Sequence, residues 1–292
     1  MRLNVTSKRL FSRILIFLYV LSVAIIVAAF IRGFDYYLTP LASRPHHPDY
    51  RLLRPAGAWG LWYGILGAAM MIAMLSYTLR KRTRLMGKAG RLKTWLDLHI
   101  FFGIVGPLLV VMHTSFKLDG LVAVSFWSMV AVALSGVFGR YLYVQIPRNI
   151  MGDAYTAEEL TKNLRAESTT LEQQLNAEQI DWLVSLMLGP HPPSHQIPFI
   201  FWMIRERITR SGRTKRARLL LKQQGYSELD QRDIMVKAHT YATLKRRAAS
   251  LRTVLSLFHH WHVFHRPFAT VMYTIMLIHI GIALAFGIAW KA

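Results

Sequence analysis

The chain contains no cysteine in its 292 residues. Thiolate-ligated iron–sulfur clusters, structural disulfides and thioether-attached c-type haem are therefore excluded within this chain. Acidic residues are also scarce, with 15 Asp and Glu against 36 Lys and Arg, which gives a net charge of +21. No GxGxxG motif, P-loop or internal repeat occurs, so the sequence carries no nucleotide-binding signature.

Long apolar runs are the main feature that the chain does have. Five are long enough to cross a bilayer: 11–32, 57–79, 96–116, 119–145 and 266–290. The first follows a basic start, as a signal peptide would, but it is long for one and has no clear cleavage site, so we interpret it as a retained helix. The expected fold class is all-α, a polytopic membrane protein with about five transmembrane helices, a four-helix bundle and a helical inner-face insertion.

Orientation follows from the Lys and Arg residues that flank these runs. Four precede the first run, and seven without any acid fill the 80–95 loop: Arg2, Lys8, Arg9 and Arg13, then Arg80, Lys81, Arg82, Arg84, Lys88, Arg91 and Lys93. We expect the N-terminus, the 80–95 loop and residues 146–264 on the inside of a bacterial inner membrane, with the C-terminus outside. Most of the positive charge then lies beside membrane spans, where contact with anionic lipid explains it better than binding of nucleic acid.

Two histidine pairs with the same spacing lie in two of the apolar runs. His99 and His113 are fourteen residues apart, and so are His265 and His279. Fourteen residues make nearly four helical turns, so each pair shares one helix face, with its members about 21 Å apart. The expected topology makes the two helices parallel and sets His99 level with His265, and His113 level with His279. Ionisable residues at membrane depth are usually functional.

Two level pairs of imidazoles suit two b-type haems, each held by one histidine from either helix. We therefore predict His99, His113, His265 and His279 as metal ligands. A lone histidine in a membrane can also simply form a hydrogen bond between helices. His259, His260 and His262 are alternative candidates for the ligand assigned to His265. Pro267 disfavours helical geometry at Arg266 and is expected to start the last helix there. Pro107 is expected to kink the helix that carries His99 and His113.

Glycines and cations complete the predicted cofactor site. Glycines near the histidines would leave room for a flat macrocycle, although small residues also serve ordinary helix packing: Gly60, Gly64, Gly67, Gly103 and Gly106. The anionic propionates need cations, for which the candidates are Arg140, Arg266 and Lys117. Positive-inside topology accounts for Arg140 and Arg266 equally well.

Four regions are expected along the chain. They are an N-terminal helix and outer loop (1–56), helices two to four of the haem bundle (57–145), a basic helical inner-face region (146–264) and the last helix (265–292). The outer loop is expected to be irregular, with His46 and His47 solvated rather than bound to metal. In the inner-face region, Thr156 and Glu159 form a capping box that opens an amphipathic helix, and GPHPPSHQIP is a break.

Three phrases resemble bacterial membrane cytochrome b subunits: WLDLHIFFGIVGPLLVVMHTSF, SGVFGRYLY and WHVFHRPFATVMYTIMLIHI. The histidine spacing is similar to that of the di-haem cytochrome b family, which includes ferric-reductase-like transmembrane proteins. The resemblance covers residues 57–145 and 258–290 and implies that His99, His113, His265 and His279 are axial haem ligands. The chain has no flavin- or NADPH-binding domain and no PEWY-like quinone motif, which suggests one subunit of a larger assembly.

The sequence therefore predicts a di-haem subunit that carries electrons across the membrane, between redox partners or the quinone pool. Expected partners are a c-type cytochrome or an iron–sulfur or flavin protein, and membrane lipid, but not nucleic acid. A quinol-oxidising or quinone-reducing anchor subunit is the redox alternative. A non-redox basic scaffold and a transporter with a histidine proton relay are the alternatives from other classes. An acidic partner is expected to dock on the 205–222 cluster, which includes Arg213, Lys215, Arg216 and Arg218.

Overall fold

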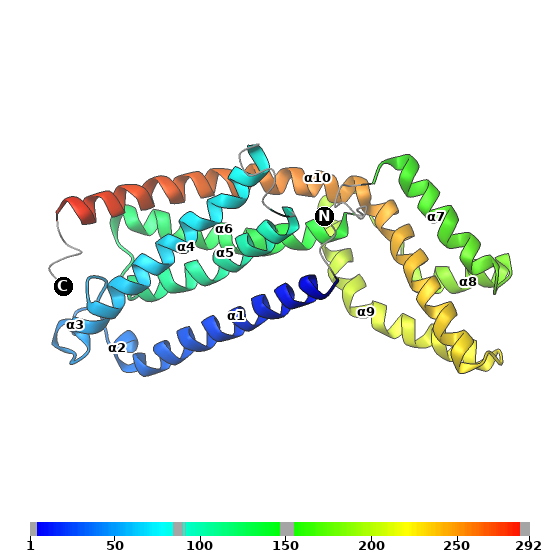
Figure 1. Cartoon of the computed structure of the whole chain (residues 1–292), viewed down its shortest axis with the longest axis horizontal. Helices are drawn as coiled ribbons and strands as arrows, with labels where there is room; N and C mark the ends of the chain where they lie inside the picture. The colour runs from blue at the N-terminus through cyan, green and yellow to red at the C-terminus, as the bar shows by residue number, and fades with distance from the viewer. Residues whose placement is uncertain (1–4, 84–89, 91, 147–154, 287–292) are drawn as a thin grey trace. The chain divides into compact units, whose positions relative to one another are not determined.

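The computed structural model describes residues 5–83, 90, 92–146 and 155–286, and it is helical throughout (Figure 1). No strand occurs among these residues, which confirms the all-α prediction. Four of the cations used to predict the orientation lie outside the described residues: Arg2, Arg84, Lys88 and Arg91. The last residues of the 266–290 run also lie outside them.

Five helical stretches are long and apolar enough to cross a membrane. They are Leu10–Arg32 of α1 (Val5–Arg32), Tyr50–Arg82 with α3 (Tyr50–Leu53) and α4 (Ala58–Arg82), α5 (Leu92–Thr114), α6 (Gly120–Gln145) and α10 (Glu228–Ala285). Their surfaces carry many exposed Leu, Ile, Val, Phe and Trp side chains, and the most apolar stretch of α1 has no buried position. Apolar surface on this scale suits contact with lipid rather than water. The chain is a polytopic helical membrane protein, as predicted.

The chain divides into two compact units. The first, here the membrane unit, comprises residues 1–137 and 263–292, and the second, here the basic unit, comprises residues 138–262. Helix α10 contributes its polar N-terminal part to the basic unit and its apolar C-terminal part to the membrane unit.

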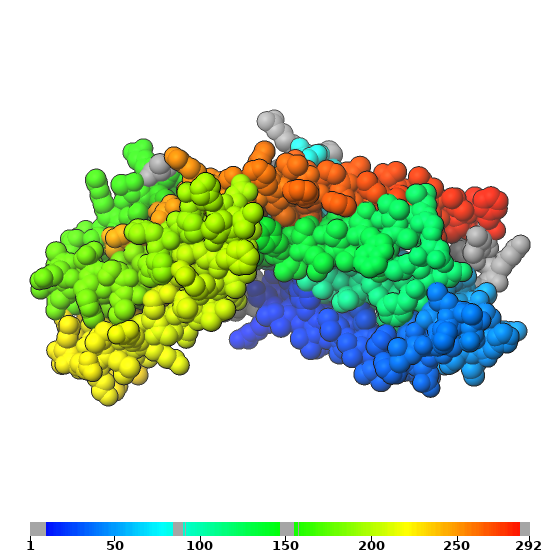
Figure 2. Space-filling model, turned by 180° about the vertical axis from the view of Figure 1, so that it is seen from behind, coloured from blue at the N-terminus to red at the C-terminus, as the bar shows by residue number. Residues whose placement is uncertain are grey.

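In the membrane unit, α4 and α5 pack closely through glycines. A Cβ atom added to Gly67 would lie 3.0 Å from the carbonyl oxygen of Gly106, so only small residues permit this approach. Elsewhere in the unit, α6 and the apolar part of α10 form adjoining bands (Figure 2), and the Ser125 hydroxyl donates to the Met272 carbonyl at 3.0 Å. Tyr273 of α10 donates to the carbonyl of Met71 on α4 at 2.6 Å.

The basic unit is built from α7 (Ala157–Glu172), α8 (Ala177–Leu188), α9 (Gln196–Gln223) and the polar part of α10. The predicted capping box of Thr156 and Glu159 is confirmed, and a second one, of Asn176 and Gln179, opens α8. Leu171, Leu183 and other apolar side chains of these helices form a buried core. The predicted break separates α8 from α9.

Two local expectations were wrong. Pro267 does not start the last helix, because α10 continues from Glu228 to Ala285 with the proline inside it. Proline removes one backbone donor, and α10 accommodates that loss without ending. The 33–56 loop is also less irregular than expected, since it contains α2 (Phe34–Leu38), the 3-10 helix η1 (Arg44–His46) and α3. Its short polar segments favour single turns stabilised by side chains.

Candidate functional site

His113 of α5 and His279 of α10 meet in the membrane unit. Their ring centroids are 6.4 Å apart and the ring planes are inclined by 62°. The later histidine of each fourteen-residue pair therefore lies beside its counterpart, as the helical spacing predicts. His113 is half-buried, whereas His279 is exposed on the surface of the protein.

The surroundings of His113 fix its orientation and its tautomer. Its Nδ1 lies 2.8 Å from the backbone carbonyl oxygen of Gly60 on α4. A carbonyl only accepts, so Nδ1 must carry the proton and donate it, which leaves the lone pair on Nε2. Gly64 makes this placement possible, because a Cβ there would lie 2.6 Å from Nδ1 of His113.

His99 and His265 show the same arrangement at Nδ1 with different partners. Nδ1 of His99 lies 3.1 Å from the carbonyl oxygen of Met74 on α4. Nδ1 of His265 lies 2.7 Å from the hydroxyl oxygen of Ser135 on α6, and that hydroxyl donates to the carbonyl of Val132 at 2.9 Å. A serine hydroxyl that donates to Val132 accepts from Nδ1 of His265, and in this arrangement His265 is protonated at Nδ1.

The rival histidines upstream of His265 have other surroundings. Nδ1 of His260 lies 2.8 Å from the Ser256 carbonyl, and Nδ1 of His262 lies 2.8 Å from the Phe258 carbonyl, both one turn earlier on α10 itself. These rings are therefore bonded to their own helix. His265, in contrast, contacts Ser135 of α6 in the membrane unit.

This donor set fits axial ligation of a haem iron. Histidines that bind metal commonly donate the other ring nitrogen to a carbonyl or another acceptor, which fixes the tautomer. Metal–nitrogen bonds of about 2 Å on opposite sides of one ion place two imidazole centres roughly 6 Å apart, close to the separation of His113 and His279. No group of three or more His, Cys, Asp or Glu that could hold an ion occurs among the described residues. A haem needs only two protein ligands, since the macrocycle supplies the other four.

The predicted glycines divide by what they contact. Gly64 faces His113, Gly60 supplies the carbonyl that orients it, and a Cβ on Gly60 would clash with the Arg54 carbonyl at 2.0 Å. Gly67 and Gly106 lie at the α4–α5 contact, and Gly103 faces the Met74 sulfur at 3.1 Å. Helix packing thus accounts for the contacts of Gly67, Gly103 and Gly106, and their clearance for a macrocycle stays a prediction.

The predicted propionate partners lie in different surroundings. Lys117 and Arg266 are exposed residues of the membrane unit. Arg140 is half-buried, belongs to the basic unit, and its guanidinium carbon lies 5.8 Å from the Tyr143 ring centroid. Their role toward propionates stays a prediction.

A buried cation that the sequence did not predict anchors the end of α5 just after His113. Arg44 is only 6% exposed. Its guanidinium donates to the carbonyl oxygen of Thr39 at 2.8 Å, to that of Tyr37 at 2.7 Å, and to that of Ser115. Ser115 has a positive φ of 48°, a conformation that costs a non-glycine residue energy. Arg44 therefore holds the turn that ends the helix carrying His113.

The 205–222 cluster is not one uniform exposed surface. Lys215, Arg216 and Arg218 are exposed, as the docking hypothesis expects, but the Arg213 guanidinium pairs with Glu206 and its side chain is only 18% exposed. Arg213 therefore differs from the other three in being paired, and docking of an acidic partner on the cluster stays a prediction. The seven-residue step from Glu206 to Arg213 puts both on one face of α9, which is the signal that could have revealed the pair.

No protein-family model matches the chain, and comparisons with curated proteins and with solved structures found no similar protein.

Proposed function

We propose that the chain is a di-haem b-type cytochrome subunit that carries electrons across a bacterial inner membrane, with its N-terminus inside. The observation that supports this most is the 6.4 Å separation of the His113 and His279 rings, together with the Nδ1 bond of His113. A bis-histidine haem, when bound, gains and loses one electron without an open coordination position for oxygen or substrate.

The residues of the chain would act by holding and orienting this group. His113 and His279 would supply the outer pair of Nε2 ligands, and His99 and His265 the inner pair. Gly60, Met74 and Ser135 would align three of the imidazoles through hydrogen bonds at Nδ1. The two sites would lie about 21 Å apart along the helices, which suits stepwise transfer. Redox partners or the quinone pool would supply and remove the electrons.

The optical spectrum of the purified protein tests this function. The reduced-minus-oxidised spectrum should be that of b-type haem, and alkaline pyridine should extract two haems per chain, because no cysteine tethers them. A chain that takes up no haem during expression with ample haem supply would exclude the proposal.

A matched pair of variants separates ligation from general damage to the fold. His99→Gln should lower the haem content by one per chain. His260→Gln on the exposed surface of α10 should leave it unchanged, since His260 bonds only locally and to Gln196. Equal haem loss in both variants would contradict the ligand assignment.

A further inference from the structure

The basic unit contains a cavity of about 640 Å³ that is lined mainly by α9 and α10. Six cationic side chains line it: Arg207, Arg210, Lys215, Arg218, Arg246 and Arg247. Glu206 is the one acid among the described residues of this lining. The cavity therefore has a strong excess of positive charge.

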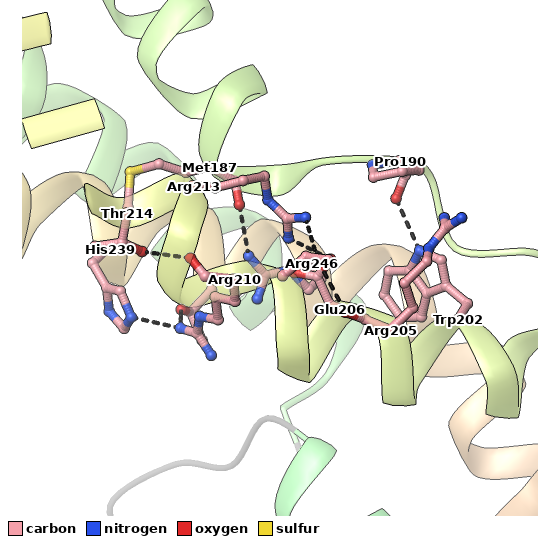
Figure 3. A network of polar contacts seen from close by, with 12 residues as sticks. Met187, Pro190, Trp202, Arg205, Glu206, Arg210, Arg213, Thr214, His239 and Arg246 are labelled. Carbon is pink, nitrogen blue, oxygen red and sulfur yellow. Dashed lines mark hydrogen bonds and ion pairs between the residues drawn. The ribbon is translucent and has the colours of Figure 1, made fainter. Parts of the chain in front are cut away.

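The single carboxylate is already engaged. Glu206 is 7% exposed and pairs with both Arg213 and Arg246, whose Nε is 3.3 Å from it (Figure 3). In the part of the chain that the structure describes, no carboxylate pairs with Arg207 or Arg247. Arg247 is half-buried, whereas Arg207 is exposed. A half-buried cation without a counter-charge raises the free energy of the fold, and a bound anion would offset this cost.

Arg210 is held in place without being neutralised. Its Nη2 donates to Nε2 of His239 at 2.6 Å (Figure 3). It also donates to the Thr243 hydroxyl at 2.8 Å. A guanidinium cannot accept a hydrogen bond, so His239 must be neutral and accept at Nε2. Both partners fix the direction of the cation while adding no negative charge, which is the arrangement expected of a preorganised anion site.

The position of the cavity indicates a membrane-bound anion. Tyr141 and Gln145, from the last turns of the membrane-spanning helix α6, form part of its lining, together with the buried rings of Phe199 and Trp202. A cavity at the end of a span lies at the depth of lipid headgroups. A second face of α9 presents large exposed apolar side chains at helical spacing, as in helices that lie on a bilayer: Ile197, Phe201, Ile204 and Ile208.

We propose that this cavity binds the headgroup of an anionic phospholipid, with its phosphate held by Arg207, Arg210 and Arg247. The phosphate supplies the missing negative charge, and the guanidinium forks match its oxygens. This lipid site is separate from the histidines of the membrane unit and does not depend on haem.

Lipid titration of the full chain in mild detergent tests this site. The probes are dioleoyl phosphatidylglycerol, with dioleoyl phosphatidylcholine as the neutral lipid, and bound lipid is counted by native mass spectrometry. The pocket variant is Arg207→Gln/Arg247→Gln, which removes one cation from α9 and one from α10. The matched control is Arg216→Gln/Arg252→Gln, which removes exposed cations of the same two helices from outside the cavity lining.

The wild-type chain and the control should both prefer phosphatidylglycerol. The pocket variant should bind it about 30-fold more weakly, since each Lys or Arg near an anionic lipid contributes roughly fivefold. Without lipid, the pocket variant should unfold at the same temperature as the wild type or higher, because repulsion between cations is relieved.

Two results would overturn the proposal. One is equal loss of phosphatidylglycerol in the pocket and control variants, which would mean that only general surface charge attracts lipid. The other is that inorganic pyrophosphate stabilises the wild-type chain as strongly as phosphatidylglycerol does and displaces the bound lipid. The cavity would then be a site for a soluble phosphate compound.

Discussion

The membrane unit and the basic unit satisfy their polar side chains in opposite ways. In the membrane unit, His99 and His113 donate from Nδ1 to backbone carbonyls, which aligns the rings and fixes a proton on Nδ1. In the basic unit, Glu206 serves two guanidiniums, while Arg247 lacks an acidic partner among the described residues. The first arrangement suits neutral ligands for a metal, and the second suits an anion. Histidines bonded to carbonyls and an excess of positive charge thus indicate different kinds of binding site.

The largest effect on haem content is expected from Gly64→Ala in the membrane unit. Its Cβ would lie 2.6 Å from Nδ1 of His113, far inside contact distance, so the imidazole must move from the Gly60 carbonyl. Overpacking of this kind costs about 1–3 kcal/mol. We expect loss of one of the two haems, measured by pyridine extraction. Gly281→Ala is the control. It lies only two residues from His279, and no atom lies within 4 Å of its new Cβ. Two haems retained in Gly64→Ala would show that the ring does not need this position.

Arg44→Gln should come next, because it removes a buried cation that holds three carbonyls. The loss of these charged hydrogen bonds should lower the free energy of unfolding by about 2–4 kcal/mol, measured by thermal unfolding. It should also shift the midpoint potential of the outer haem alone in a redox titration. Arg51→Gln, at an exposed position of the same loop region, is the control. An equal shift at both haems would contradict the assignment of Arg44 to the end of α5.

Ser135→Ala should have a smaller and local effect. It removes the acceptor for Nδ1 of His265, and outer-shell losses of this kind reduce metal affinity by about 10-fold. We expect weaker retention of the inner haem in a competition assay with apo-globin, with the outer haem unaffected. Ser125→Ala on the same helix serves as the comparison, since Ser125 bonds to a backbone carbonyl instead. Unchanged retention would favour another ligand in place of His265.

Gly212→Ala in the basic unit should have the smallest effect, and it should be opposite in sign. Nothing lies within 4 Å of its new Cβ in α9, so alanine only lowers the backbone entropy of the unfolded chain. We expect a gain of about 0.5–1 kcal/mol in thermal unfolding and no change in haem content. A loss of stability there would show that this face of α9 packs against something.

Features that depend on short-range periodicity were predictable from the sequence. The five spans, the capping box of Thr156 and the meeting of His113 with His279 all follow from helix geometry and hydropathy. These signals lie within one or two segments of chain. The sequence therefore gives the helices and the face on which their histidines lie.

Features that depend on distant partners were not predictable. Arg44 bonds to a carbonyl 71 residues away, and no local pattern distinguishes it from the other arginines of its loop. The contact between Gly64 and His113 and the bond between Ser135 and His265 likewise depend on how separate helices cross. The continuity of α10 through Pro267 also departs from the local preference of proline for a helix start.

The most direct test of the account is the haem content of His113→Gln, His279→Gln and the double variant. If the two rings ligate one iron from opposite sides, each single variant should retain one haem per chain, and the double variant should also retain one. The remaining haem should have the same spectrum and midpoint potential in all three. Two haems in either single variant, or a further loss in the double variant, would contradict the claim that His113 and His279 form one site.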